Sequence, residues 1–395
     1  MMKGDIIIVH GGDISEPSGG TNRVIAFANA LSQNGFKVNL IVPKPTKEIP
    51  TSISLADGIE LQTVPVILKR GIKSQIFRGL AVLRKAKKVA IDKNAIIQIE
   101  HSSLGGLATL LGISNFVLDM HDLCFANPLY DIPGIAIIVK KFMYELEKNA
   151  LSHATRIIVV SNRMKKFVVD EWDIDGKKII VIPNGYFEGK LKKYLNEKSI
   201  RSVDDLNRSC RNTSICFLGT LDPKINIEKI ICLANRIKDA QIYVIGEGPV
   251  LDKLKRRVRK EGLNNIIITG RIPDDRAFEL IINSQACILP LYPSKHTEVS
   301  CPVKVFDYAA LGKAIVMDNV AEVCEIFKEN NAAIVVDPWD QDKFIESVQI
   351  LLEDEKLRGM ISQNARNLVK SFSWEEQGRK IVRMYEEIFS SDVSE

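Results

Sequence analysis

The stretch SCPVKVFDYAALGKAIVMD, Ser300 to Asp318, contains one complete unit of the pattern that decides the fold. It opens with a polar loop marked by a proline, continues as a short helix, and passes through a glycine into an apolar, β-branched strand. An acid, Asp307, falls in the first turn of that helix, three residues after Lys304. The helix macrodipole favours an acid there by about 0.3–1 kcal/mol. Asp307 is therefore either a stabilising surface acid or a ligand contact.

The same succession of loop, helix and strand repeats along the chain. Apolar runs predict ten strands: DIIIVH (5–10), KVNLIV (37–42), AIIQI (95–99), FVLDM (116–120), RIIVV (156–160), SICFLG (214–219), QIYVIG (241–246), NIIITG (265–270), ACILPL (286–291) and KAIVMD (313–318). Strands that are apolar on both faces are typical of a parallel sheet covered by helices. A polar stretch from about 186 to 212 separates two series of runs. This organisation predicts an α/β protein with two Rossmann-like, doubly wound domains facing a central cleft.

Composition narrows the class of protein. The chain has 395 residues, is 46% apolar and 26% charged, and carries a net charge of +5, which is too small to indicate nucleic-acid binding. The cysteines are seven, and none are spaced as C-x-x-C, which favours buried thiols in a reducing compartment over disulfides or zinc. No run reaches the ~18–20 apolar residues of a membrane span, and the N-terminal run is too short for a signal peptide. We expect a cytoplasmic protein.

Two glycine-containing loops are candidates for phosphate binding. GEGPVL (246–251) follows a strand and begins like a dinucleotide fingerprint, but it lacks the third glycine and the acid that NAD sites need. SGGT (18–21) places Gly19 and Gly20 directly before a helix, where backbone N–H groups can approach an anion. A tight turn between strand and helix explains the same glycines equally well. P-loop, G-x-S-x-G and H-E-x-x-H motifs are absent from the sequence.

Eight short motifs, in order, carry a family resemblance: SGGTNR (18–23), DMHD (119–122), VSN (160–162), VIPNG (181–185), FLGTLDPK (217–224), IGEGP (245–249), ITGRIPDD (268–275) and VFDYAALGKAIV (305–316). With these motifs the chain resembles the retaining nucleotide-sugar glycosyltransferases of the GT-B fold, glycosyltransferase family four. The resemblance extends to FSWEEQGRKIVRMYEEI (372–388). It implies an acceptor domain over 1–190 that receives a crossing helix over 373–391, a connector over 191–211, and a nucleotide-sugar-binding domain over 212–372.

The resemblance implies roles for residues on the donor side. Asp307 matches the family's acid that binds the ribose hydroxyls, and Lys304 would neutralise the leaving diphosphate as a catalytic cation. A solvated lysine is the alternative for Lys304. The implied donor-binding set is Gly19, Gly20, Gly219, Thr220, Lys224, Gly246, Arg271, Ile272, Ser300, Val303, Lys304 and Asp307.

The chain departs from the family pattern in two places on the donor side. Thr220 stands where the family usually has an arginine, and Lys224 is displaced by one residue. Glu298 is one residue out of register with the first of the family's paired acids. Either Lys224 and Lys304 share the charge of the diphosphate, or Arg271 reaches it, or donor binding is weak.

The resemblance also assigns His121 to the donor sugar, as a catalytic residue. His10, Glu100 and His101 are candidate acceptor contacts, because they too follow or end predicted strands, where ligands bind in open α/β sheets. No D-x-D motif stands at a strand end, so we expect no metal and no cofactor beyond a UDP- or GDP-sugar donor.

The expected reaction is retaining transfer of a hexose-type sugar to a hydroxyl of a glycan or lipid-linked acceptor, in surface polysaccharide or glycolipid assembly. A weakly active nucleotide-sugar-binding subunit and a nucleotide-sugar epimerase are the alternatives, and slow donor hydrolysis would favour the transferase. The segment 69–90 predicts a basic amphipathic helix. It is either a contact with the anionic inner face of the plasma membrane or an ordinary surface helix of the first domain.

Overall fold

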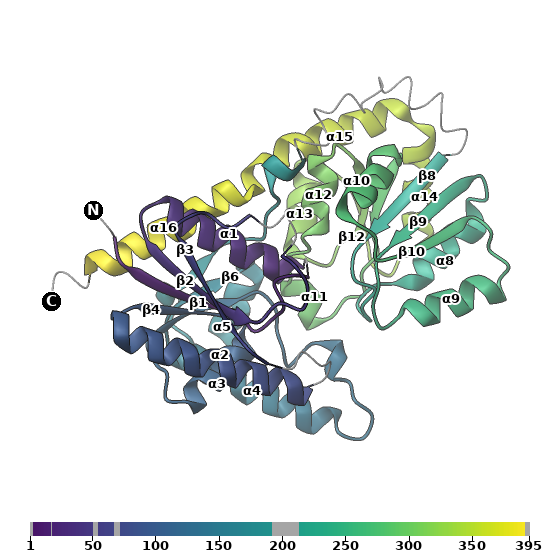
Figure 1. The fold of residues 1–395 in the computed structure, drawn as a ribbon. Coiled ribbons are helices and arrows are strands. Elements are labelled where there is room, and N and C mark those ends of the chain that lie inside the picture. Colours follow the sequence, from purple (N-terminus) through teal and green to yellow (C-terminus); the bar gives the residue numbers. More distant parts are fainter. Residues whose placement is uncertain (1–2, 17, 50–53, 67–71, 192–212, 392–395) are drawn as a thin grey trace. The chain divides into compact units, whose positions relative to one another are not determined.

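The computed structural model describes residues 3–16, 18–49, 54–66, 72–191 and 213–391. Their contacts divide the chain into two compact units. The first unit comprises Met1–Gly185, Val299–Cys301 and Trp374–Glu395, and the second comprises Tyr186–Glu298 and Pro302–Ser373. Each unit contains one parallel sheet with helices on both faces (Figure 1). Most of the predicted connector, from 192 to 211, lies outside the described residues.

The sheet of the first unit has seven strands in the order β3-β2-β1-β4-β5-β6-β7. The strands are β1 (Asp5–Val9), β2 (Lys37–Pro43), β3 (Ile59–Val64), β4 (Ile96–Glu100), β5 (Phe116–Met120), β6 (Ala154–Val159) and β7 (Ile179–Val181). All neighbours are parallel. The five predicted strands of this half are confirmed. The sequence reading omitted β3 and β7, because β3 is only half-buried and β7 has three residues.

Two groups of helices cover the two faces of this sheet (Figure 1). On one face lie α1 (Gly19–Gln33) and α16 (Trp374–Ser391); on the other lie α2 (Ile72–Lys93), α3 (Ser102–Leu110) and α4 (Ala136–His153), while α5 (Asn162–Trp172) connects β6 to β7. The C-terminal helix α16 is part of this unit. Trp374 packs edge-on against Phe27 of α1 with ring centroids 6.0 Å apart, and the Tyr385 hydroxyl donates to Gln98 at 2.9 Å.

The sheet of the second unit has six parallel strands in the order β10-β9-β8-β11-β12-β13. They are β8 (Thr213–Leu218), β9 (Ala240–Ile245), β10 (Ile266–Gly270), β11 (Ala286–Leu289), β12 (Ala314–Asp318) and β13 (Ile334–Val336). The helices are α8 (Ile227–Arg236), α9 (Leu251–Lys260), α10 (Asp274–Asn283), α11 (Lys295–Val299), α12 (Lys304–Ala310), α13 (Glu322–Glu329), α14 (Gln341–Glu353) and α15 (Glu355–Val369). The predicted strands are again confirmed, and the three-residue β13 was missed.

Within each unit the strands follow the same order: third, second, first, fourth, fifth, sixth. The sheet of the first unit adds a seventh strand after the sixth. This is the doubly wound order of Rossmann-like domains, and it confirms the predicted fold class. In such sheets ligands bind outside the carboxyl ends of the strands, where the direction of winding reverses. That point lies between β1 and β4 in the first unit and between β8 and β11 in the second. In the described part of the chain, no helix is both long enough and apolar enough to span a membrane.

Candidate active site

Four predicted site residues of the first unit meet at the carboxyl ends of three neighbouring strands. His10 follows β1, Glu100 ends β4 with His101 next to it, and His121 follows β5. The Glu100 carboxylate accepts a hydrogen bond from His10 Nδ1, and its Oε1 lies 4.0 Å from His121 Nδ1. The rings of His101 and His121 are 5.3 Å apart. The structure therefore gathers the predicted acceptor residues and His121 into one cluster.

The protonation states within this cluster follow from burial and neighbouring charge. Burial would raise the pKa of Glu100, but His10, together with His121 and His101, lowers it below the ordinary value. Burial, reinforced by His121, lowers the pKa of His101 to about 4. The cluster thus offers an ionised carboxylate beside a neutral imidazole at neutral pH. His101 also has a φ of 82°, a conformation that non-glycine residues rarely adopt and that is found at functional sites.

Three buried polar atoms in the cluster have no hydrogen-bond partner among the described residues: His10 Nε2, Glu100 Oε1 and His121 Nδ1. Buried polar groups are nearly always paired, so their convergence indicates a site for a polar ligand. The start of α1 borders the same place. A Cβ atom on Gly20 would lie 3.2 Å from Glu100 Oε1 and 3.6 Å from His121 Nε2, so the glycine leaves space beside both side chains. Gly19 is the first residue of that helix.

A buried acid that the sequence analysis did not predict holds the segments that carry His101 and His121. Glu147, on α4, accepts hydrogen bonds from the Ser102 hydroxyl at 2.7 Å and from the backbone N–H groups of Cys124 and Phe125 at 2.8 Å each. Ser102 is the residue after His101, at the end of β4, and Cys124 lies three residues after His121, at the end of β5. The Glu147 carboxylate therefore links the segments that follow these two strands. Burial raises the pKa of Glu147 to about 7 although these hydrogen bonds oppose the shift. The available signal was an acid among the apolar residues of the segment that precedes the predicted strand RIIVV (156–160).

The same cluster contains three side chains that could together hold a metal ion, and the sequence-based expectation that no metal is needed stays a prediction. One ligand atom from each of His101, His121 and Asp122 lies within 4.8 Å of the other two. A neutral imidazole and a carboxylate are suitable ligands for a divalent transition metal.

In the second unit, glycines line the carboxyl ends of β8, β9 and β10. Gly219, Gly246 and Gly270 all have positive φ angles, of 142°, 137° and 68°. The N–H of Gly219 donates to the carbonyl of Ile245, and that of Gly246 donates to the carbonyl of Gly270, each at 2.9 Å. A Cβ on Gly246 would overlap the carbonyl of Gly219, so only glycine permits this approach of the two loops.

Lys304 occupies the space that a side chain at position 219 would need. Its ammonium lies 4.6 Å from the centre of the Phe217 ring, and it forms no ion pair with the described residues. Burial, and then the charge of Lys224, lower the pKa of Lys304 to about 7. Lys224 itself lies 3.8 Å from Asp222. Lys304 is therefore not fully solvated, as the alternative interpretation of this residue assumed, although part of its surface remains accessible.

Asp307 lies in the first turn of α12, one turn after Lys304. Its carboxylate accepts no hydrogen bond from the described residues and remains partly accessible. Burial raises the pKa of Asp307 to about 7, while Lys190 opposes the shift and Asp274 adds to it. Lys190 and Asp274 form an ion pair with each other. An acid without a partner is the state expected of a ligand contact rather than of a satisfied helix cap.

The remaining donor-binding candidates stand in several segments of the chain. Val303 precedes α12, and Ile272 is half-buried after β10, beside exposed Arg271. Thr220, which stands where the family usually has an arginine, is exposed. Ser300 lies in the short Val299–Cys301 segment, which belongs to the first unit.

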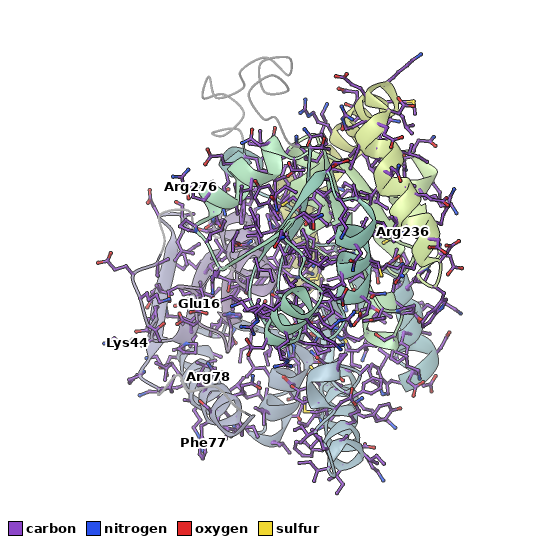
Figure 2. All side chains as sticks on the ribbon, turned by 90° about the vertical axis from the view of Figure 1, so that its right-hand side faces the viewer. Glu16, Lys44, Phe77, Arg78, Arg236 and Arg276 are labelled. Carbon is purple, nitrogen blue, oxygen red and sulfur yellow. The ribbon has the colours of Figure 1, made fainter. Side chains whose placement is uncertain are left out.

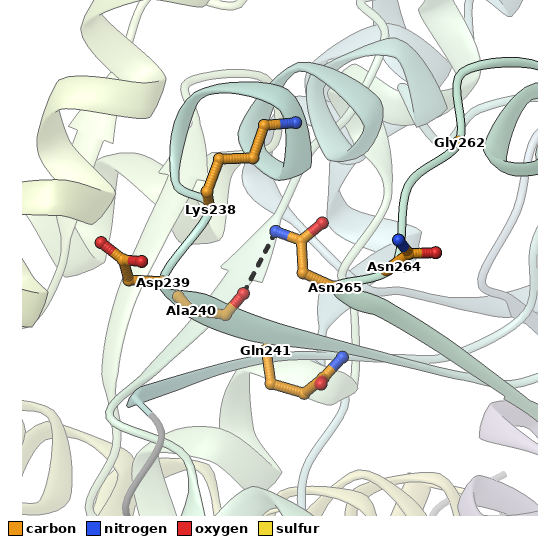
Figure 3. Close-up of a pocket in the computed structure, with 7 residues that line it drawn as sticks. All are labelled: Lys238, Asp239, Ala240, Gln241, Gly262, Asn264 and Asn265. Carbon is orange, nitrogen blue, oxygen red and sulfur yellow. Dashed lines mark hydrogen bonds between the residues drawn. The ribbon is translucent and has the colours of Figure 1, made fainter.

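A polar hollow in the second unit lies at the opposite edge of the sheet. Residues preceding or beginning β9 and β10 line it: Lys238, Asp239, Ala240, Gln241, Gly262, Asn264 and Asn265 (Figure 3). The Asn265 amide donates to the carbonyl of Ala240 at 3.3 Å, and also to those of Ala234 and Ile237. These are the amino ends of the strands, and none of the predicted site residues is among them.

Comparison with known proteins supplies the family. Residues 203–368 match the model of "Glycosyl transferases group 1", and residues 17–186 match that of "Glycosyltransferase Family 4". A galactosyltransferase of Escherichia coli, named for UDP-Gal and α-D-GlcNAc-diphosphoundecaprenol, is 23% identical over 90% of both chains. A glycosyltransferase of Methanocaldococcus jannaschii is 24% identical over 61% of this chain, and the match spans only 59% of that protein.

Among solved structures, the sucrose-phosphate synthase of Thermosynechococcus elongatus superimposes with a TM-score of 0.79, at 17% identity, over 98% of this chain and 100% of its own. Anabaena HepE in complex with UDP-glucose has a TM-score of 0.69 at 14% identity, over 98% of this chain and 100% of its own. Similarity at this level of identity concerns the fold, and both structures have the fold found here.

Proposed function

The chain belongs to family four of the GT-B glycosyltransferases and is an enzyme of the hexosyltransferase type, and from that premise we propose that it transfers a hexose with retention of configuration from a nucleoside-diphosphate sugar. It acts on a glycan or lipid-linked acceptor. The donor sugar, the stereochemistry and the pathway of surface polysaccharide or glycolipid assembly are parts of the proposal.

The observation that carries the proposal is the pair formed by Lys304 and Asp307. A partly accessible cation and a partly accessible acid stand one helical turn apart, and neither has an ion-pair partner among the described residues. A diphosphate needs a cation, and the vicinal hydroxyls of a ribose are donors that suit a carboxylate. Gly219 leaves the space that Lys304 occupies, and Gly246 lets the next loop approach Gly219 closely.

The reaction assigns different tasks to the two units. Lys304 stabilises the negative charge that develops on the leaving diphosphate as the bond to the anomeric carbon breaks. The acceptor oxygen attacks from the face that the diphosphate leaves, and the acceptor proton passes to a diphosphate oxygen. His121 and Glu100 orient the sugar through the two polar atoms that lack partners.

Relatives suggest which substrates to try first. The Escherichia coli relative is named for a UDP-sugar donor and a lipid-diphosphate acceptor, and the Anabaena structure contains UDP-glucose. We therefore assign to this chain a UDP-hexose donor, with a GDP-hexose as the second choice, and a polyprenyl-diphosphate-linked sugar as the acceptor.

Exposed apolar side chains support binding to a membrane surface that carries such an acceptor. Ile137, Ile138 and Phe142 at the start of α4 are 84%, 71% and 51% exposed, and exposed Lys141 lies among them. Phe77 near the start of α2 is 71% exposed and projects outward (Figure 2). The rest of α2 presents basic residues: Arg84, Lys85, Lys87 and Lys88. Apolar side chains beside cations favour an anionic bilayer.

Two experiments test the proposal. The purified chain is incubated with UDP- and GDP-hexoses, alone and with a polyprenyl-diphosphate sugar, and nucleotide release is measured. Acceptor-dependent release is expected above a slow background of donor hydrolysis, whereas a pure binding subunit releases no nucleotide. Sedimentation with phosphatidylglycerol vesicles tests the membrane surface. Ile138→Glu should reduce pelleting, while Ile350→Glu, at a 40% exposed position of the second unit, should not.

A further inference from the structure

Residues from four of the sequence motifs take part in one set of hydrogen bonds in the first unit. Arg23 of SGGTNR and Asp119 of DMHD are both fully buried, and they form a bidentate pair with N–O distances of 2.8–3.0 Å. The Arg23 Nη1 atom also donates to Asn184 Oδ1 of VIPNG at 3.2 Å. The proposed chemistry gives none of these three side chains a task.

The network continues to a segment from a distant part of the sequence. Val299–Cys301, called the strap below, belongs to the first unit although its neighbours on both sides belong to the second. The Asn184 amide donates to the carbonyl of Cys301 at 2.8 Å. The hydroxyl of Ser161, from the VSN motif, donates to the carbonyl of Val299 at 2.7 Å. Both ends of the strap are therefore held by side chains of the first unit.

The strap is connected covalently and closely to the donor-binding pair. Only Pro302 and Val303 separate Cys301 from Lys304. Proline fixes its own φ near −65° and restricts the conformation of the residue before it. A displacement of Cys301 is therefore expected to move Lys304 as well. Asp307 is on the same short helix as Lys304.

We propose that Asn184 and Ser161, with Asn184 oriented by the Arg23–Asp119 pair, are positioning residues that fix the strap and thereby set where Lys304 and Asp307 meet the donor. This inference rests on the proposed function only for the identity of the ligand. Asn184 is well suited to the task because its two side-chain atoms do different work: its oxygen accepts from Arg23 and its nitrogen donates to the strap.

Asn184→Asp separates these two contacts. The acid keeps an acceptor for Arg23 but has no N–H group for the carbonyl of Cys301. The thiol of Cys301 is buried, and its rate of alkylation, measured by peptide mass spectrometry, reports release of the strap without any nucleotide. We expect the rate to rise by about five- to tenfold, the factor that one net hydrogen bond is worth. The affinity for the nucleoside diphosphate should fall by a similar factor.

Asn265→Asp is the matched control. It removes an amide donor to three carbonyls at the amino ends of the strands of the second sheet, and none of these carbonyls belongs to the strap. It should leave both the alkylation of Cys301 and nucleotide affinity unchanged. Ser161→Ala is a second variant, expected to speed alkylation like Asn184→Asp. Because Ser161 also caps α5, Asp354→Ala, which removes the cap of α15, controls for loss of a cap.

The outcomes are separable. Unchanged alkylation in both Asn184→Asp and Ser161→Ala would overturn the anchoring, and faster alkylation with wild-type nucleotide affinity would overturn the positioning role. A wild-type chain that binds no nucleotide would contradict the proposed function, while the alkylation result would still decide whether the strap is anchored.

Discussion

The ammonium group of Lys304 lies 4.6 Å from the centre of the Phe217 ring, in the space left by the missing side chain of Gly219. Gly219→Ala is therefore expected to displace the lysine and to weaken nucleoside-diphosphate binding by about tenfold or more, because the cation moves away from the phosphates. Calorimetric titration measures the change.

Gly262→Ala is the control for backbone strain. Gly262 also has a positive φ, of 62°, but a Cβ there would meet nothing within 4 Å. It should lower thermal stability slightly and leave nucleotide binding intact. Equal losses of affinity in the two variants would show that strain, and not Lys304, explains the effect.

Asp307→Ala should weaken nucleotide binding by about 1.5–3 kcal/mol, the range for hydrogen bonds to a charged group. His121→Ala should leave nucleotide affinity nearly intact and lower turnover, because His121 is assigned to the sugar. Asp252→Ala removes an exposed acid from the first turn of α9 and should change neither quantity. If His121→Ala costs as much nucleotide affinity as Asp307→Ala, the division of tasks is wrong.

Binding of a nucleotide sugar should be linked to protons with opposite signs at pH 6 and pH 8. Lys304 has a pKa of about 7, so at pH 8 it is mostly neutral and takes up a proton when the diphosphate binds. Asp307 also has a pKa of about 7, so at pH 6 it is mostly protonated and releases a proton when ribose hydroxyls donate to it. Calorimetry in buffers of different ionisation enthalpy measures both.

Variants assign the two proton transfers. Lys304→Met should abolish the uptake at pH 8, and Asp307→Asn should abolish the release at pH 6. Uptake that persists at pH 8 in Lys304→Met would place the titrating group elsewhere.

Glu147 should make thermal stability depend on pH. Because its pKa in the folded chain, about 7, lies above the ordinary value of 4.5, its contribution to stability is complete below pH 4.5 and is lost as the pH rises through 7. Relative to Glu147→Gln, the wild type should therefore lose up to about 3 kcal/mol between pH 5 and pH 8. Exposed Glu145, on the same helix, provides the control Glu145→Gln. Parallel pH profiles of wild type and Glu147→Gln would contradict this.

Chelation tests the group formed by His101, His121 and Asp122. If Lys304 and Lys224 supply the charge that the diphosphate needs, activity should survive EDTA unchanged. Loss of activity that Mn²⁺ or Zn²⁺ restores would instead assign a metal to these three residues.

The sequence predicted most of the architecture because buried parallel strands have a strong signature. Runs such as FVLDM are mostly apolar and buried on both faces, and the structure places that strand at the predicted residues, Phe116–Met120. Strands without that signature were not predicted, and the half-exposed strand Ile59–Val64 is an example. Candidate residues at strand ends, His10, Glu100 and His121, followed directly from this reading, because strand ends of one parallel sheet meet at one edge.

Supporting residues could not be predicted in the same way. Glu147 serves the site through a helix packed behind it, and Asn184 serves it through a segment more than a hundred positions away in sequence. Hydrophobic periodicity reports which face of a helix is buried, but not which buried polar group meets which partner. Thr220 marked a departure from the family pattern, and the sequence named Lys304 as one of the cations that could compensate, but only the structure shows that the Lys304 ammonium lies against the Phe217 ring.

The membership of α16 in the first unit has a consequence for protein synthesis. Domains generally fold as they emerge from the ribosome, the N-terminal one first. Here the first unit lacks the contacts of Trp374 with Phe27 and of Tyr385 with Gln98 until α16 has been synthesised. About 190 residues separate Gly185 from Trp374, which at ribosomal speed is a delay of roughly 10–40 s. The half of the chain that is translated first is therefore the half that is completed last, and a nascent chain stalled before Trp374 exposes the apolar flank of α1 to chaperones.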